Sequence, residues 1–262
     1  MAGSLNTDVR AWHAEVRALT ELRHPCIVQY LGAVMEPPTH CLVLEYCDGG
    51  DVRTALRRPT EPDFALQVAS SVAAGMWYLH RKGIMHRDLK SANVLLSHSS
   101  HERIAVKLTD FGIAVQVGHT VGDGDTAAAT SLSSVGTFRW MAPEVARNER
   151  YSKSADVFSF AMLLFELITH QVPFADRAPM LAVLATSMQG QRPPIPDGTP
   201  ELLRTLVHDC WQDSPAKRPT FEHVHGVLAQ SRQSLSLPEQ QWLDAPSGHP
   251  VYALPSVTDV AE

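Results

Sequence analysis

The chain has 262 residues, a length that suits one large domain or two small ones. Hydrophobic residues make up 44% of it, which allows a sizeable buried core of the kind found in soluble proteins. Its 22 basic and 28 acidic residues give a net charge of -6. The chain therefore lacks the basic excess that marks general binders of nucleic acid or anionic membranes.

The cysteines and the N-terminus indicate a cytoplasmic protein. The four cysteines form no CxxC pair and no metal-site spacing, so we expect reduced thiols. The first residues show no basic-then-apolar signal, and Ala2 stands where myristoylation requires glycine. The most apolar run, residues 158–168, contains Ser159 and Glu166 and is too short to span a bilayer, so we expect a buried helix and no membrane insertion.

The first part of the chain predicts one helix and two strands. Apolar side chains recur at steps of three and four over residues 7–23, which marks one face of a helix that ends at Pro25. Residues 26–34 and 41–44 are apolar runs that predict two strands joined by a loop. Residues 45–51 have two glycines and no periodicity, which indicates a linker.

The strongest helix prediction covers residues 60–81. Thr60 and Asp63 fit a capping box, and Gly83 suits the first position after the helix. Its apolar face consists of Phe64, Val68, Val72, Met76 and Leu79. A short apolar strand is expected at residues 94–96, and alternating apolar residues predict another at 104–108.

The second half predicts a loop and then helices. Residues 115–134 are rich in glycine, serine and threonine, which is typical of a mobile loop. Helices are expected at 156–168, 178–187, 200–211 with Thr199 as its cap, and 221–230 with Thr220 as its cap. The composition from residue 231 onward predicts a disordered tail, and the order of elements predicts an α+β fold.

The segment HRDLKSAN, residues 86–93, lies in the loop between the long helix and the next strand. A loop of this kind can hold a carboxylate, an ammonium group and an amide over one small volume. Phosphoryl transfer needs a group that positions the attacking hydroxyl, a cation on the transferred phosphate and oxygen ligands for Mg²⁺. The alternative for these side chains is a solvated turn.

Together, HRDLKSAN, Asp110-Phe111-Gly112 and Ala142-Pro143-Glu144 occur in the order of the protein kinase signature. Over residues 8–230 the chain resembles the protein kinase family. Lys90 resembles the serine/threonine type, and residues 136–144 are similar to the tyrosine-kinase-like group, where Raf-like and mixed-lineage enzymes sit. The resemblance implies a bilobal α+β fold with a partial N-lobe at residues 1–48 (helix C, strands 4 and 5, and the hinge), a mostly helical C-lobe at 49–230 and the tail at 231–262.

The resemblance further implies that the chain phosphorylates serine or threonine hydroxyls of protein substrates with ATP and Mg²⁺. Asp88 would be the catalytic base, Lys90 would contact the γ-phosphate, and Asn93 and Asp110 would hold Mg²⁺. Four more residues would bind ATP: Glu45 and Cys47 at adenine through their backbones, Asp51 at ribose and Leu95 beneath adenine. Leu44 would guard the back pocket, although Leu44 and Leu95 could equally be plain core residues.

Other matches would be structural or regulatory. Glu144 and Arg218 resemble a buried ion pair, and Asp156 resembles the residue that holds the backbone of residues 86–87. Glu15 matches the helix glutamate that pairs with the ATP-binding lysine, and the apolar stack between the lobes would comprise Leu19, Tyr30, His86 and Phe111. Thr137 would support Asp88 and Lys90. Arg87 and Ser133, with its neighbours Thr130, Ser131 and Ser134, suggest a phosphorylation switch, although a loop without a switch remains an alternative.

The chain departs from the family at its beginning. No GxGxxG loop and no VAIK lysine precede the helix that carries Glu15, so the chain looks like a kinase domain without its first three strands. We therefore expect weak phosphate transfer by the chain alone. Three hypotheses stay open: a fragment of an active kinase, a weak or inactive kinase-like module that binds partners, and a different nucleotide or metal enzyme. The third is disfavoured because no P-loop, HExxH or GxSxG motif is present.

Overall fold

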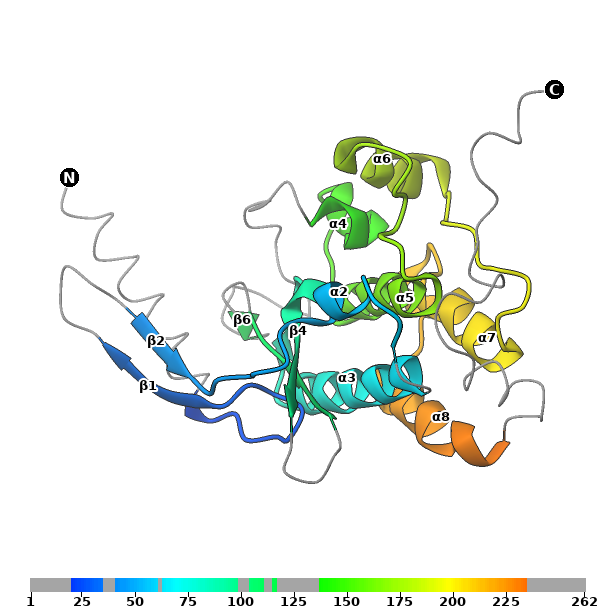
Figure 1. Cartoon of the computed structure of the whole chain (residues 1–262). Helices are drawn as coiled ribbons and strands as arrows, with labels where there is room; N and C mark the ends of the chain where they lie inside the picture. Colours follow the sequence, from blue (N-terminus) through cyan, green and yellow to red (C-terminus); the bar gives the residue numbers. More distant parts are fainter. Residues whose placement is uncertain are drawn as a thin grey trace, which may run out of the picture.

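The chain folds into a small strand-bearing part and a larger helical part (Figure 1), which confirms the α+β class. The computed structural model describes residues 20–34, 41–60, 63–98, 104–110, 115–116 and 137–234. Most of the helix expected at residues 7–23 lies outside these ranges, and so do Glu15 and Leu19. Thr20 is helical and Leu22 is buried. No helix of the described residues is long and apolar enough to cross a membrane.

Strands β1 (Tyr30–Val34) and β2 (Cys41–Leu44) form an antiparallel pair with an irregularity between Tyr30 and Gly32. The strand predicted at 26–34 begins only at Tyr30. The residues before it pair elsewhere, because Val28 donates to the carbonyl of Leu108 and Leu108 donates to Cys26, both over 2.9 Å. Leu31, Val34, Val43 and Leu44 of this pair are exposed. Leu44 is therefore not a core residue.

The predicted linker at residues 45–51 is irregular and leads into α2 (Val52–Ala55), a helix that the sequence analysis missed. Gly49 runs close along the next strand, donating to the carbonyl of Leu96 over 2.9 Å. A Cβ at Gly49 would stand only 2.8 Å from that oxygen, so the close approach requires glycine.

Helix α3 (Phe64–Arg81) begins later than the sequence predicted. Its N-cap is Asp63 rather than Thr60, so the predicted capping box is wrong. The reason is local, since Asp63 has a φ of 67°, outside the helical region. The predicted end is confirmed, with Lys82 as C-cap and Gly83 at a φ of 74°.

Two short antiparallel pairs flank the segment at residues 86–93. One joins β3 (Ile84–Met85) to β6 (Val115–Gln116), and the other joins β4 (Val94–His98) to β5 (Ile104–Leu108). The strands expected at 94–96 and 104–108 are confirmed, with β4 two residues longer. The loop prediction at 115–134 is wrong for its first two residues, which form β6, and residues 117–134 lie outside the described ranges.

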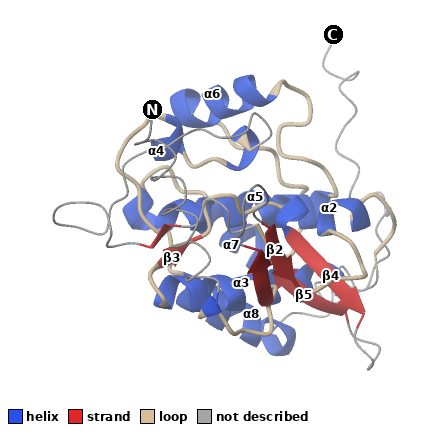
Figure 2. Cartoon of the chain, turned by 90° about the vertical axis from the view of Figure 1, so that its left-hand side faces the viewer, coloured by secondary structure: helices blue, strands red, loops and turns tan. Residues whose placement is uncertain are grey.

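Helix α5 (Ser154–Thr169) is the core of the helical part. It begins two residues before its predicted start, and all but its first two residues are buried. Figure 2 shows α5 between α4 (Pro143–Ala146) and α6 (Pro179–Gln189) on one side and α3 and α8 (Phe221–Ser234) on the other. This arrangement fits its sequence, which is apolar around nearly its whole circumference.

The remaining C-terminal elements are η2 (Phe138–Trp140), α7 (Glu201–Cys210) and η3 (Pro215–Lys217). The cap of α7 is Pro200, not Thr199, whose hydroxyl is buried and has no partner among the described residues. The hydroxyl of Thr220 accepts from His223 N–H over 3.3 Å, as expected of a cap. Helix α8 continues to Ser234, so the first four residues of the predicted tail are helical.

Candidate active site

The loop at residues 86–93, which includes the 3₁₀ turn η1 (Ser91–Asn93), is held from below by Asp156 of α5. Its carboxylate accepts from the N–H groups of His86 and Arg87, at 3.0 and 2.8 Å, and lies 2.8 Å from His80 Nε2. Burial opposes ionisation of Asp156, but the bonds from His80 and from the loop hold its pKa below the usual value. Arg87 takes a φ of 68°, so two backbone bonds stabilise a turn that a non-glycine residue rarely adopts.

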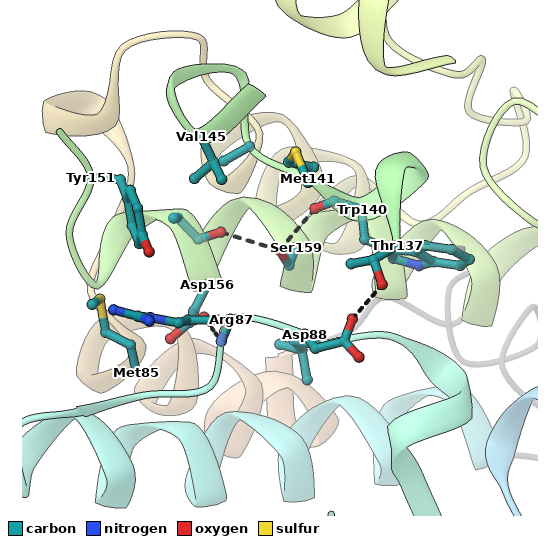
Figure 3. A pocket seen from close by; sticks show the side chains of 13 residues that line it. Met85, Arg87, Asp88, Thr137, Trp140, Met141, Val145, Tyr151, Asp156 and Ser159 are labelled. Atoms are coloured by element: carbon teal, nitrogen blue, oxygen red, sulfur yellow. Dashed lines mark hydrogen bonds between the residues drawn. The ribbon is translucent and has the colours of Figure 1, made fainter. Parts of the chain in front are cut away.

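Above this turn, three other predicted side chains contact the Asp88 carboxylate (Figure 3 shows the bond to Thr137). Lys90 Nζ lies 2.6 Å from Asp88 Oδ2, and Asn93 Nδ2 donates to the same oxygen over 2.9 Å. The Thr137 hydroxyl donates to Asp88 Oδ1 over 2.9 Å and accepts from Lys90 over 3.2 Å. Asp88 and Asn93 are buried, so these bonds fix both side chains in one orientation.

Asp110 follows β5 at the end where β4 begins. The register pairs Val94 with Leu108, and Thr109 donates to the carbonyl of Asn93 over 3.0 Å. Asp110 is exposed and has a φ of 64°. The carboxylate of Asp110 and the amide oxygen of Asn93 therefore lie at the same end of this hairpin.

This pair of oxygen donors fits Mg²⁺, which protein sites hold through one or two carboxylates together with substrate phosphates. Asn93 uses only Nδ2 in its two bonds to Asp88, so Oδ1 can serve as a ligand. Within the described ranges, no group of three or more His, Cys, Asp or Glu side chains could hold a metal ion.

The linker between β2 and α2 brings the predicted ATP-binding residues alongside β4. Asp51 forms an antiparallel bridge with Leu95, which is half-buried, and Cys47 is buried nearby in the linker. The backbone N–H of Glu45 donates to the carbonyl of Gln29 over 2.9 Å. The backbone group of Glu45 that can bond a ligand is therefore its carbonyl.

Two of these side chains already have partners. Glu45 Oε1 accepts from Gln29 N–H over 2.6 Å and from Lys107 Nζ over 2.7 Å, which ties the linker to β5. Both Asp51 oxygens accept from Thr54, at 2.8 and 3.0 Å, so Asp51 caps α2. A ribose hydroxyl would have to share this carboxylate with the helix cap.

Glu144 and Arg218 form a buried pair, as the sequence analysis expected. Two parallel bonds of 2.7 and 2.8 Å join the guanidinium to the carboxylate. The guanidinium also donates to three backbone carbonyls and stands 5.1 Å from the Phe158 ring centroid. The pair joins α4 to the segment before α8 and lies apart from the Asp88 cluster.

Ser133 and Phe111 lie outside the described residues, as do Glu15 and Leu19. Arg87 directs its guanidinium to the Tyr151 ring, 5.5 Å from the centroid.

A small pocket that is partly open to solvent lies beside the Asp88 cluster. Its lining is mixed (Figure 3). The polar lining residues are Arg87, Asp88, Thr137, Asp156 and Ser159, and the apolar ones include Met85, Leu89, Met141, Val145 and Tyr151. A side chain that entered this pocket would lie next to the group that Asp88 contacts.

Glu166 is a site residue that the sequence analysis missed. Its carboxylate accepts from the Ser91 hydroxyl over 2.6 Å, from Ser91 N–H over 3.2 Å and from Trp140 Nε1 over 2.7 Å. It therefore joins the loop at 86–93 to η2. Burial raises the pKa of Glu166 to about 7, although the bonds from Ser91 and Trp140 act in the opposite direction.

A signal for this role exists in the sequence. Asp156, Ser159 and Glu166 share one face of α5, spaced as residues i, i+3 and i+10. Ser159 donates to the carbonyl of Trp140 over 2.8 Å, so all three hold loops of the site. A polar stripe along an otherwise apolar helix could have identified them.

Comparisons with known proteins identify relatives of this chain. A family model described as protein tyrosine and serine/threonine kinase matches residues 2–228. The chain is 36% identical over 220 residues to serine/threonine/tyrosine-protein kinase HT1 of Arabidopsis thaliana, covering 82% of this chain and 53% of that protein. It is 38% identical over 226 residues to serine/threonine-protein kinase STY17 of the same plant, covering 85% and 37%.

A third relative is human mitogen-activated protein kinase kinase kinase 13, at 32% identity over 245 residues, covering 90% of this chain and 24% of that protein. The chain thus spans about half or less of the length of these relatives.

Proposed function

Because this chain belongs to the protein tyrosine and serine/threonine kinase family, we propose that it transfers the γ-phosphate of ATP to serine or threonine hydroxyls of a protein substrate. The observation that carries the proposal is the bonded cluster of Asp88, Lys90, Asn93 and Thr137. It supplies a positioned carboxylate beside an ammonium group, as phosphoryl transfer requires.

In this proposal Asp88 accepts the proton of the substrate hydroxyl as that oxygen attacks phosphorus. Lys90 lies beside Asp88 and stabilises the negative charge of the transferred group. Thr137 bonds both side chains and fixes the distance between them. Asn93 and Asp110 would hold Mg²⁺, which when bound neutralises phosphate charge.

ATP would lie along the linker and β4. The Glu45 carbonyl and the Cys47 backbone would bond adenine, Leu95 would lie beneath it, and Asp51 would bond ribose. Residues 1–48 would then act as a partial N-lobe and residues 49–230 as the C-lobe. The protein would act in the cytoplasm, in keeping with its reduced cysteines.

We extend the proposal to regulation of the same site by phosphorylation at Ser133. A phosphate there would pair with Arg87, which directly precedes Asp88 in the loop. Mass spectrometry of an active sample is the measurement, and an active sample without modification anywhere in residues 115–141 would rule out this switch.

The experiment that tests the function measures ATP binding and phosphate transfer to serine, threonine and tyrosine peptides. We expect transfer to serine or threonine, and a loss of about 10²- to 10⁴-fold in Asp88→Asn with ATP binding retained. Asp197→Asn, which changes an exposed carboxylate away from the cluster, is the matched control.

Transfer that survives in Asp88→Asn, or that reaches tyrosine alone, would refute the assignment. ATP binding without transfer in both proteins would favour the alternative function, a kinase-like module that binds partners.

A further inference from the structure

Helix α6 carries an unusual surface. Residues 178–191 include no charged side chain. The residues that α6 turns inward are mostly small, among them Ala182, Ala185 and Ser187. The residues that it turns outward are large and apolar, and they are between 41% and 67% exposed: Met180, Leu181, Leu184 and Met188. We call these four side chains the α6 face.

This arrangement reverses the usual pattern of a surface helix, which buries its large apolar residues and exposes polar ones. The small inward residues suit the packing of α6 against α4 and η2. The four side chains of the α6 face are all exposed, and Figure 1 places α6 at the outer edge of the molecule beside α4. Its exposed apolar area is roughly 400 Å², within the range of roughly 300–600 Å² for the largest patch of a typical monomer.

We propose that the α6 face is the surface through which two copies of this chain pair, with their α6 helices antiparallel about a twofold axis near Leu184. Leu184 lies at the middle of α6, and Met180 and Met188 lie one turn to either side on the same face. A twofold pairing therefore packs Leu184 against its own copy and each methionine against the opposite one. The flexible methionine side chains adapt to such a contact.

The charges around α6 suit a second copy of the same chain. Asp176 and Arg177 pair at its N-terminal end over 3.1 Å. Arg147 donates to the carbonyl of Ser187 near its C-terminal end and pairs with Glu149 over 2.9 Å. Each end thus presents one acidic and one basic group, so antiparallel pairing of two copies sets no net like charges against each other at either end. A highly charged partner would find no counter-charge along residues 178–191.

The area sets the strength of this pairing. Roughly 400 Å² per copy is about half of the roughly 800 Å² per partner in a standard stable interface. We therefore expect a weak dimer whose population depends on concentration, and its formation does not depend on phosphate transfer.

The chain has a second exposed apolar surface, which serves as the control. Leu31, Val34 and Val43 on β1 and β2 are between 46% and 59% exposed. Undescribed residues adjoin these strands at 1–19 and 35–40, whereas α4 and α6 both lie within the unbroken range 137–234. An experiment must therefore separate association through α6 from association through β1 and β2.

Sedimentation equilibrium from about 10 μM to about 1 mM is the test, because it separates the 28.8 kDa monomer from its dimer. The wild type should approach the dimer mass at the high end. Leu184→Glu and Leu184→Lys should each weaken association by about tenfold or more, since like charges meet on the axis, and an equimolar mixture of the two should associate again. Leu31→Glu should associate as the wild type does.

Leu184 is exposed, so its variants should keep the wild-type circular dichroism, and Met188→Glu provides a second variant if they do not. A wild type that stays monomeric at about 1 mM overturns the proposal. Association lost in Leu31→Glu but kept in Leu184→Glu overturns it too. A mixture of the Glu and Lys variants that stays monomeric would show that α6 does not pair with itself.

Discussion

Replacing Glu166 with glutamine should raise the free energy of unfolding above neutral pH and should change that free energy little near pH 5. Glutamine can keep all three contacts of the carboxylate. Its carbonyl oxygen can take the place of Oε2, which accepts from Ser91 N–H and Trp140 Nε1. Its amide nitrogen can take the place of Oε1, 2.6 Å from the Ser91 hydroxyl, which then accepts instead of donating. The glutamine of the Glu166→Gln variant therefore resembles the protonated form of the wild-type side chain.

The magnitude follows from the burial of this carboxyl. Its pKa rises from 4.5 to about 7 on folding. Between these pH values the unfolded chain has released a proton that the folded chain keeps, so the stability of the wild type falls as pH rises through this window. A shift of this size corresponds to about 3 kcal/mol in total. Glutamine has no proton to release, so the stability difference between variant and wild type should grow by about that amount across the window.

Urea unfolding followed by circular dichroism, from about pH 5 to about pH 8.5, measures the difference directly. Taking the difference between the two proteins removes the titration of every other group. Glu222→Gln, an exposed position on α8, reports the loss of a carboxylate at the surface. A difference that stays constant with pH, or that favours the wild type at high pH, would refute the reasoning. It would show that the donors of Ser91 and Trp140 outweigh burial and keep Glu166 ionised.

Three further substitutions test other contacts. Thr137→Val removes the hydroxyl that joins the carboxylate and the ammonium group of the cluster, and should slow phosphate transfer by about 10- to 100-fold in a peptide assay, whereas Thr137→Ser should keep most of the rate. Arg218→Leu leaves the buried Glu144 carboxylate without its cation and should cost about 3–5 kcal/mol in urea unfolding, so a loss below about 1 kcal/mol would contradict the burial argument. Gly75→Ala should destabilise by about 1–3 kcal/mol, because the new Cβ would stand 2.8 Å from Leu108 Cδ1 and 3.1 Å from a backbone carbonyl. Gly226→Ala, also inside a helix but with nothing within 4 Å of the new Cβ, should stabilise the fold by about 0.5–1 kcal/mol. Equal shifts in melting temperature for the two glycine variants would show that contact with the new Cβ does not decide the sign of the stability change.

The elements that the sequence predicted well are those with a long local pattern. Helix α3 has five apolar residues on one face and glycine after its end, and β5 alternates over its full length. The pattern failed where a single backbone angle decided the outcome, as at Asp63, whose positive φ moved the start of α3. It also failed for elements too short to show a period. Helix α2 has four residues, and β3 and β6 have two each and form only by pairing with distant segments.

The site residues likewise divide into those that a local motif predicted and those that it did not. Asp88, Lys90 and Asn93 fall within six residues of one another, so a motif could predict that they meet. The partner that joins them to the rest of the site comes from Thr137, 49 residues after Asp88. Only the resemblance to a known family predicted that contact, because no local pattern links the two positions.

The polar face of α5 explains why the loops of the site are held together and not separately. Asp156 bonds the backbone before Asp88, Glu166 bonds both Ser91 and Trp140, and Ser159 bonds the carbonyl of Trp140. These partners lie between 19 and 75 residues away in the chain. From the sequence alone, each polar residue is therefore only a break in the apolar pattern of the helix. In the fold they let one rigid buried helix position the loop that carries the carboxylate and the segment that carries the Thr137 hydroxyl. A change in the charge of Glu166 would therefore act on both segments at once, which is why its titration near neutral pH has a consequence for the site as well as for stability.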